Sequence, residues 1–300
     1  MIPFVRDFVP DHGRHIRHTP LISRVTADNP GPFTFTGTNT FIVGRETPGA
    51  GVAVIDPGPE DPAHQDALLS AVSGRRVSHV LVTHTHRDHA PLARPFAEAV
   101  GAPVLAALPP VVVTHASGRL DADEDVDFRP DRLLVDGEVI EGDGWTLRTL
   151  ATPGHASNHL AFALEEENAL FCGDHVMGWS TTVVAPPDGD MAAYMASLDR
   201  VVAAGFDRLW PTHGAAIDDP SPFLAAYRAH RLDRDAQILA RLHAGDARIS
   251  EIVPHLYAAV DRRLWPAAAL SVWAHLIAMV ADGRAVAAPA AVLDADYAPG

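Results

Sequence analysis

The sequence predicts an α/β (α+β) fold, with sheets covered by helices in residues 1–220 and a small helical domain in residues 221–300. Two observations predict this class. Short apolar runs rich in β-branched residues recur through the first 220 residues and alternate with stretches of helical apolar spacing. After the proline-rich segment at residues 218–222 the pattern becomes almost wholly helical, so we place the domain boundary there.

The expected strands are short runs bounded by glycine, proline or aspartate. They lie at residues 34–43, 52–56, 77–82, 104–106, 146–150 and 160–164, with a further run at Leu209. Apolar residues spaced three and four apart predict helices at 63–72, 90–100 and 191–204. Residues 33–43 and 144–170 are expected to form antiparallel meanders.

The C-terminal domain is expected to hold helices at 223–243, 250–260 and 267–280, followed by a short strand or wing at 285–288. Ser250 is a plausible N-cap and Pro266 suits a first helical turn. Such a domain resembles a winged-helix module, whose third helix often enters a DNA groove. No arginine lies between Pro266 and Asp282, so we expect no sequence-specific DNA binding. We expect this domain instead to have a structural role, to form a homodimer contact, or to act as a lid over the metal site predicted below.

The composition excludes disordered and fibrous classes. The chain has 300 residues, 47% hydrophobic and 20% charged, which is typical of a globular protein with one large core or two domains. Its one cysteine, Cys172, rules out an internal disulfide framework and a four-cysteine zinc site. A metal site therefore has to use imidazole and carboxylate ligands, and seventeen histidines make that possible.

The net charge and the apolar segments indicate which classes of binding partner are disfavoured. Arginine supplies all 23 basic residues, and 38 acids leave a net charge of −15, which disfavours attraction to polyanions such as nucleic acid. The acidic excess is strongest in residues 121–143. Residues 264–281 approach the length of a membrane span, but their proline, serine and histidine favour a buried helix and no membrane contact. The N-terminus lacks a secretory pattern, so we expect a cytoplasmic protein.

The strongest signal for chemistry is the segment Thr83-His84-Thr85-His86-Arg87-Asp88-His89, which directly follows the apolar run Val80-Leu81-Val82. In extended or loop backbone, His84, His86 and Asp88 alternate and can project to one side, with His89 turned to another. Burying three imidazoles and a carboxylate in one loop would leave several polar groups unsatisfied. A divalent cation supplies the compensating charge, so the segment predicts a metal site.

Three further segments place a polar residue beside a glycine at an expected strand end. They are Thr152-Pro153-Gly154-His155, Cys172-Gly173-Asp174-His175 and Pro211-Thr212-His213-Gly214. Each glycine allows the backbone to turn close to a bound ion or substrate. Taken with the first motif and in this order, they resemble the ligand pattern of the metallo-β-lactamase superfamily.

A finer resemblance covers nearly the full chain. The segments similar to the lactamase-β-like protein 2 subfamily include Asn29-Pro30-Gly31-Pro32-Phe33, Gly37-Thr38-Asn39-Thr40, Thr152 to His155 with His159, and Thr181-Thr182-Val183 with Tyr194-Met195, while His230-Arg231 matches its C-terminal domain. The resemblance implies an αββα metallo-β-lactamase-fold catalytic domain in residues 1–220 and a winged-helix-like domain in residues 221–300. In the animal members it implies an endoribonuclease acting on single-stranded RNA.

The resemblance also implies two Zn²⁺ ions per chain at the sheet edge. The expected ligands are His84, His86 and His155 on the first zinc and Asp88, His89 and His213 on the second, with Asp174 bridging both. True zinc β-lactamases place a cysteine where this chain has Asp174, and flavodiiron relatives place a glutamate where it has His86. Both of those activities are therefore disfavoured, although spacing alone leaves iron or manganese open.

The implied mechanism follows from the charge of the ions. Two zinc ions can share a water and lower its pKa toward about 7, which produces a metal-bridging hydroxide as the nucleophile. Asp88 is expected to accept a hydrogen bond from this hydroxide and to aim it. His159 and His175 are candidates for protonating the leaving group, and equally for supporting the ligands.

The expected function is a zinc-dependent hydrolase whose substrate class stays open. The subfamily resemblance favours a phosphodiesterase acting on single-stranded RNA. The net charge instead favours a small-molecule ester, thioester or lactone, as in glyoxalase II-like hydrolases. The third hypothesis is an iron-dependent oxygenase similar to persulfide dioxygenases. Such enzymes use only part of the histidine set, so the presence of His89 and His213 weighs against it.

Overall fold

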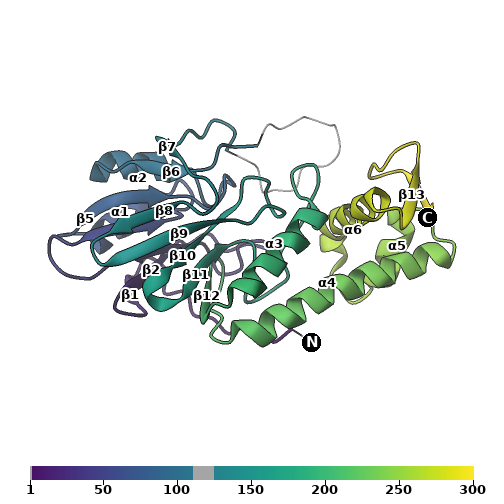
Figure 1. Ribbon diagram of the computed structural model, residues 1–300, viewed down its shortest axis with the longest axis horizontal. Coiled ribbons are helices and arrows are strands. Elements are labelled where there is room, and N and C mark those ends of the chain that lie inside the picture. Colours follow the sequence, from purple (N-terminus) through teal and green to yellow (C-terminus); the bar gives the residue numbers. More distant parts are fainter. Residues whose placement is uncertain (1, 111–124) are drawn as a thin grey trace.

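The computed structural model describes residues 2–110 and 125–300. In this part of the chain two sheets lie face to face, helices cover their outer faces, and a helical lobe follows at the C-terminal end (Figure 1). This arrangement confirms the predicted α/β class, the αββα sandwich and the helical C-terminal domain. Residues 121–124 of the acidic run lie outside the described residues.

The larger sheet has seven strands and is mixed. In spatial order they are β1 (Ile16–Arg17), β2 (Ile22–Thr26), β3 (Asn39–Val43), β4 (Gly51–Ile55), β5 (Arg76–Leu81), β6 (Val104–Ala106) and β7 (Arg132–Leu133). Strands β1 to β4 pair antiparallel, and β4 to β7 pair parallel. Parallel neighbours need a crossover, and helices α1 (Pro62–Ala71) and α2 (Ala93–Val100) supply those from β4 to β5 and from β5 to β6, on one face.

The second sheet has five strands. In spatial order they are β12 (Arg208–Pro211), β11 (Ala169–Gly173), β10 (Leu160–Leu164), β9 (Trp145–Ala151) and β8 (Val139–Gly142). Strands β8 to β11 form an antiparallel meander, with the short helix η1 (Glu165–Glu167) between β10 and β11. The pair β11 and β12 is parallel, and α3 (Met191–Ala204) makes that crossover.

The layers are held by the alternation of side chains along each strand. In β3, Phe41 lies in the core between the two sheets, whereas Ile42 lies in the core beneath α1 and α2. In β10, Phe162 faces the other sheet, and Ala163 faces α3. Alternate side chains of each strand thus point into different cores. Because both faces of the sheet are buried, these strands are apolar throughout.

The C-terminal part consists of α4 (Pro220–His243), α5 (Ile249–Leu256), η2 (Arg262–Leu264), α6 (Trp265–Ala281) and the hairpin of β13 (Ala285–Ala288) and β14 (Asp296–Pro299). The start of α4 packs Phe223 and Tyr227 into the core of the five-stranded sheet, and its end packs Ile238 and Leu242 into the core of the lobe. One continuous helix thus connects the two parts (Figure 1). The boundary at residue 220 stays a prediction.

Helix α6 and the turn before it are long and apolar enough to span a membrane by length and composition alone. In the fold, Val272, Leu276 and Met279 are fully buried in the core of the lobe. Apolar composition on this helix is therefore explained by packing against α5 and the β13–β14 hairpin.

The strand predicted over residues 34–43 begins only at Asn39. Phe35 and Gly37 have positive φ values of 55° and 125°, which β-strands do not accommodate, so the chain turns there instead. Asn29 stabilises this turn: its side-chain amide donates to the Thr38 hydroxyl, and its carbonyl oxygen accepts from the Thr38 backbone N–H.

The cap predicted at Ser250 was wrong. Helix α5 begins at Ile249, so Ser250 lies inside it. The carboxylate of Glu251 accepts hydrogen bonds from the backbone N–H groups of Ala247 and Arg248, which satisfies the start of the helix from within its first turn. The helix also ends at Leu256, short of the predicted residue 260.

Acid sensitivity is expected from His64, a buried histidine of α1. The Thr40 hydroxyl donates to the Asp56 carbonyl and lies 2.9 Å from His64 Nε2, so it accepts the proton of that nitrogen. Burial lowers the pKa of His64 to about 4. A histidine with a depressed folded-state pKa stabilises the fold above pH 6.5, and this contribution is lost as the pH falls from 6.5 toward 4.

We expect His64→Gln, which keeps a donor for Thr40, to reduce this acid sensitivity. Between pH 7.5 and 5.0 the free energy of unfolding of the wild-type protein should fall by about 2 kcal/mol more than that of the variant, from a shift of this size. Urea unfolding at the two pH values measures the difference. Equal pH dependence in the two proteins would show that His64 does not titrate as its burial indicates.

Candidate metal centre

The four predicted segments meet where strands of the two sheets end. Residues 83–89 follow β5, residues 152–155 follow β9, residues 174–175 follow β11, and residues 212–214 follow β12. The structure brings all seven predicted ligands into three overlapping groups whose ligand atoms lie within 4.8 Å of one another: His84, His86 and His155; His84, His89 and Asp174; and Asp88, His89 and His213.

The first group is a set of three imidazoles. His84 Nε2 lies 2.8 Å from His86 Nδ1, and His155 Nε2 lies 3.1 Å from the same nitrogen. The group around Asp88 joins a carboxylate to two imidazoles: Asp88 Oδ2 lies 3.1 Å from His213 Nε2 and 3.5 Å from His89 Nε2.

Asp174 lies between these two groups and turns one oxygen to each. Its Oδ1 lies 3.4 Å from His213 Nε2 and 3.6 Å from His89 Nε2, while its Oδ2 lies 3.7 Å from His155 Nε2. One carboxylate is thus shared by both sets. This is the placement that the resemblance implied for a bridging ligand.

The donor set fits a divalent cation. His89 Nε2 and His213 Nε2 lie 3.6 Å and 3.4 Å from Asp174 Oδ1, but these three buried atoms make no well-aligned hydrogen bond within the described residues. Buried polar atoms without partners are costly. A cation coordinated by them removes the cost, and imidazole with carboxylate is a suitable donor set for zinc.

The far side of several of these imidazoles is fixed by a hydrogen bond that leaves the inward nitrogen free to coordinate. His155 Nδ1 lies 2.6 Å from the Val183 carbonyl, and His213 Nδ1 lies 3.2 Å from the Gly37 carbonyl. His84 Nδ1 lies 3.0 Å from the Thr83 hydroxyl. Such outer partners set the tautomer and the orientation of metal-binding histidines.

Asp56 is a residue of the site that the sequence reasoning missed. Its fully buried carboxylate accepts hydrogen bonds from the Thr83 N–H and hydroxyl, both at 2.7 Å, from His89 Nδ1 at 2.9 Å and from the Thr212 hydroxyl at 3.1 Å. It thereby ties together the loops after β4, β5 and β12. The available signal was Asp56-Pro57-Gly58, a polar residue at a strand end like those of the predicted ligands.

His159 is turned toward the backbone of Asp174. The Asp174 N–H donates to His159 Nε2 at 3.1 Å, and His159 Nδ1 lies 2.8 Å from the Thr152 hydroxyl. Both ring nitrogens are therefore engaged. Gly173 permits this approach, because a Cβ at that position would lie 2.5 Å from His159 Nε2. These contacts favour a positioning role for His159, and its role as a proton donor stays a prediction.

His175 is fully buried and its ring packs on Tyr194, with the ring centroids 4.9 Å apart. Neither ring nitrogen has a hydrogen-bond partner among the described residues. Burial lowers the pKa of His175 to about 3, so the ring is neutral at physiological pH. This environment favours packing, and proton donation by His175 likewise stays a prediction.

Helix α4 reaches the site through Thr182. The Thr182 hydroxyl donates to the Asp174 carbonyl at 2.8 Å, its N–H donates to the Tyr227 hydroxyl at 2.5 Å, and its carbonyl accepts from the Arg231 guanidinium. The same guanidinium lies over the ring of Tyr194, 5.0 Å from its centroid. Tyr227 and Arg231 on α4 thus hold the loop that follows the shared carboxylate.

Charge in the cluster is balanced internally. Burial lowers the pKa of His84 and of His155, so these imidazoles are neutral. At His213 the opposite charges of Asp174 and Asp88 outweigh burial and raise the pKa to about 10. The neighbouring imidazoles lower the pKa of Asp174 and of Asp88 well below the usual value. Without a cation, protons therefore supply the positive charge, and a metal displaces them because its ligands must be deprotonated.

Each of the two parts of the chain matches a known protein family. Residues 33–213 match the model of the metallo-beta-lactamase superfamily, and residues 249–291 match the beta-lactamase associated winged helix domain. Among curated proteins, the chain is 32% identical over 254 residues to the atrochrysone carboxyl ACP thioesterase of Aspergillus chevalieri, covering 81% of this chain and 75% of that protein. It is 34% identical over 260 residues to the lactamase-like protein aptB of Emericella nidulans, covering 82% and 77%.

Two solved structures share nearly the whole fold. A beta-lactamase domain protein from Burkholderia ambifaria aligns with a TM-score of 0.81 and 23% identity, over 100% of this chain and 97% of that one. A metallo-beta-lactamase family protein from Thermus thermophilus aligns with a TM-score of 0.75 and 26% identity, over 94% and 99%. Both alignments extend through the C-terminal lobe.

Proposed function

From the premise that this chain belongs to the metallo-beta-lactamase superfamily, we propose that it is a di-zinc hydrolase that cleaves acyl thioesters. The observation that carries the hydrolase assignment is the placement of Asp174, whose two oxygens face two separate sets of ligands. The thioester assignment draws on the relatives, because the name of one of them states a thioesterase acting on an acyl carrier protein.

Seven residues would hold the metals, namely His84, His86 and His155 on one zinc, Asp88, His89 and His213 on the other, and Asp174 on both. Bound zinc ions supply Lewis acidity, which activates water at neutral pH and stabilises negative charge on an attacked oxygen. The residues of the chain supply the rest of the chemistry.

Asp88 has a more open carboxylate than Asp174, since 23% of its side chain is exposed against 6% for Asp174. Its carboxylate is therefore placed to accept the proton of a water that attacks an acyl carbon from the solvent side. In thioester hydrolysis the water oxygen bonds to that carbon, the carbon–sulfur bond breaks, and a carboxylic acid and a thiol are released.

The leaving group supports a thioester over a phosphodiester. A thiol has a pKa near 8.5, so it departs as a thiolate without a strong acid beside it, whereas an alcohol departs far less readily. The contacts of His159 and His175 do not favour such an acid, because the first has both ring nitrogens engaged and the second is buried with a pKa of about 3.

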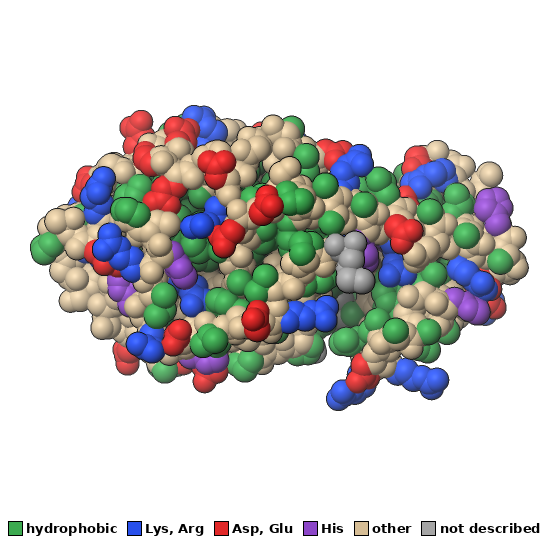
Figure 2. Space-filling model, turned by 90° about the horizontal axis from the view of Figure 1, so that it is seen from below, with side chains coloured by type: hydrophobic (Ala, Val, Ile, Leu, Met, Phe, Trp, Pro, Cys, Tyr) green, Lys and Arg blue, Asp and Glu red, His purple; other side chains and the backbone are tan. Residues whose placement is uncertain are grey.

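Surface charge supports the same choice. Binding of a single strand without sequence preference relies on a positively charged groove with aromatic platforms. On the face drawn in Figure 2, acidic and arginine side chains are interspersed and form no continuous basic band among the described residues. With a net charge of −15, the protein suits an uncharged acyl group better, and cleavage of single-stranded RNA stays an untested prediction.

The assignment is tested by offering the zinc-loaded protein three substrates: the decanoyl thioester of N-acetylcysteamine, the matching oxygen ester, and an end-labelled single-stranded RNA. We expect thioester hydrolysis that a chelator suppresses by at least about 100-fold and that added zinc restores, with the oxygen ester slower by roughly tenfold or more. Chelator-sensitive cleavage of the RNA without thioester hydrolysis would contradict the proposal and favour the endoribonuclease.

A further inference from the structure

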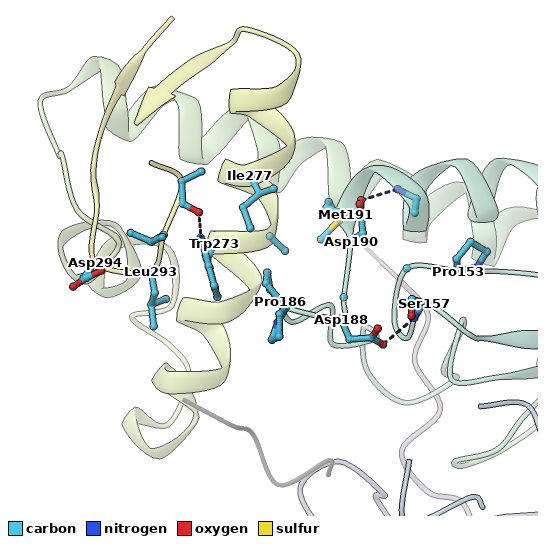
Figure 3. Close-up of a pocket in the computed structure, with 17 residues that line it drawn as sticks. Pro153, Ser157, Pro186, Asp188, Asp190, Met191, Trp273, Ile277, Leu293 and Asp294 are labelled. Carbon is cyan, nitrogen blue, oxygen red and sulfur yellow. Dashed lines mark hydrogen bonds between the residues drawn. The ribbon is translucent and has the colours of Figure 1, made fainter. Parts of the chain in front are cut away.

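A groove of about 750 Å³ lies between the first domain and the C-terminal lobe, apart from the ligand cluster. One wall comes from the loops at residues 153–157 and 186–190 and from the first turn of α3, and the other from α6 and the connection between β13 and β14 (Figure 3). Its volume is in the range of small-molecule sites, which often form where two domains meet.

The walls of the groove are mainly apolar. Trp273 and Ile277 project from α6 toward Pro186 and Met191 on the other side, and Leu293 closes the lobe end (Figure 3). An apolar ligand gains from leaving water here, since each buried methylene contributes about 0.8 kcal/mol.

Three polar side chains of the groove already have partners within the protein. Trp273 Nε1 donates to the Ala291 carbonyl at 3.0 Å. Asp188 accepts from the Ser157 N–H at 2.8 Å, and Asp190 accepts from the Ala193 N–H at 2.9 Å at the start of α3. Among the described lining residues there is no arginine or histidine, and the charged ones are all aspartates. The groove therefore disfavours phosphates and carboxylates and fits an uncharged apolar group.

The groove and the cluster share one loop. Gly154 lines the groove, and the next residue, His155, carries a nitrogen of the ligand set. Consecutive Cα atoms are about 3.8 Å apart, so the groove wall begins one residue from the cluster. Residues 183–186 also connect the cluster to the groove. The Val183 carbonyl forms a hydrogen bond with His155 Nδ1, and Pro186, three residues later, lines the groove.

We propose that this groove binds the apolar acyl portion of the thioester while the thioester carbonyl lies at the metal centre. The inference rests on the proposed function and adds the substrate class, a medium-length or longer uncharged acyl group. The C-terminal lobe would then contribute to substrate selection, because α6 supplies one wall of the groove that holds the acyl group.

Chain-length selectivity tests the proposal. Ile277→Trp fills the groove, and Ile277→Asp adds a charge to it; both should raise KM for the decanoyl thioester of N-acetylcysteamine about tenfold or more. KM for the acetyl thioester should change less than about twofold, because two carbons do not reach the groove. Leu264→Trp is the matched control, since Leu264 is 41% exposed and does not line the groove.

A binding measurement separates this inference from the proposed function. Calorimetry with the non-hydrolysable S-decyl thioether of N-acetylcysteamine should show binding to the wild-type protein and to Leu264→Trp, and at least about tenfold weaker binding to both Ile277 variants. Thermal unfolding verifies that each variant is folded. If no thioester is hydrolysed but this binding pattern holds, the proposed function fails and the apolar site stands. Unchanged binding and chain-length profiles in the folded Ile277 variants, or no binding to the wild-type protein, would overturn the groove assignment.

Discussion

Asp88→Ala is expected to lower kcat for thioester hydrolysis by about 10³-fold or more, because it removes a carboxylate that we propose both as a zinc ligand and as the proton acceptor. The carboxylate lies 3.1 Å from His213 Nε2 and is more exposed than that of Asp174. His86→Ala, which removes the imidazole shared by the contacts of His84 and His155, should have a similar effect. Steady-state kinetics with the zinc-loaded variants measures both losses.

The fold of both variants should be preserved, since neither side chain belongs to an apolar core. Asp66→Ala, an exposed aspartate of α1, is the matched control and should retain wild-type turnover. Far-ultraviolet circular dichroism verifies that the variants are folded. Hydrolysis by Asp88→Ala within a few-fold of the wild-type rate would show that the mechanism is wrong.

Asp56→Ala is expected to destabilise the protein by about 3–5 kcal/mol, because it leaves four buried donors without their acceptor. These donors come from Thr83, His89 and Thr212. Loss of the acceptor that orients His89 should also weaken metal binding by about 10- to 100-fold. Urea unfolding of the metal-free protein and zinc titration against a chelator measure the two effects independently.

Asp56→Asn separates charge from hydrogen bonding, since its amide oxygen still accepts while its NH₂ group opposes the donors around it. It should fall between the wild-type protein and Asp56→Ala in stability. An Asp56→Ala protein within about 1 kcal/mol of the wild type and with unchanged zinc affinity would exclude the role assigned to this carboxylate.

The regular elements were predictable where apolar spacing was strong. Residues 191–204 were predicted as a helix and form α3 with the same bounds, capped by Asp190 and ended by Gly205. The run at 285–288 forms β13. Strand β2 was missed: Ile22–Thr26 contains a serine and an arginine, and only the fold shows that both are buried. Arg24 reaches the Asn39 side chain there, a partner that its neighbours in sequence do not reveal.

The side chains that cluster at the site were also predictable, because a dense histidine motif and glycine-marked strand ends are local signals. The supporting residues were not. Asp56 precedes the histidine motif by almost thirty residues, and Tyr227 and Arg231 act from a helix of the C-terminal part. Their contacts arise from the pairing of strands and the packing of α4, which a local pattern does not encode.

The central claim, that seven side chains hold two zinc ions, is tested most directly by anomalous diffraction at the zinc edge from crystals of the zinc-loaded protein, with metal content measured on the same sample. The account predicts two zinc equivalents per chain and two anomalous peaks. One should lie among His84, His86 and His155, and the other among Asp88, His89 and His213, with Asp174 in contact with both. Peaks away from these residues would contradict it, and a single iron in their place would favour the iron-dependent oxygenase.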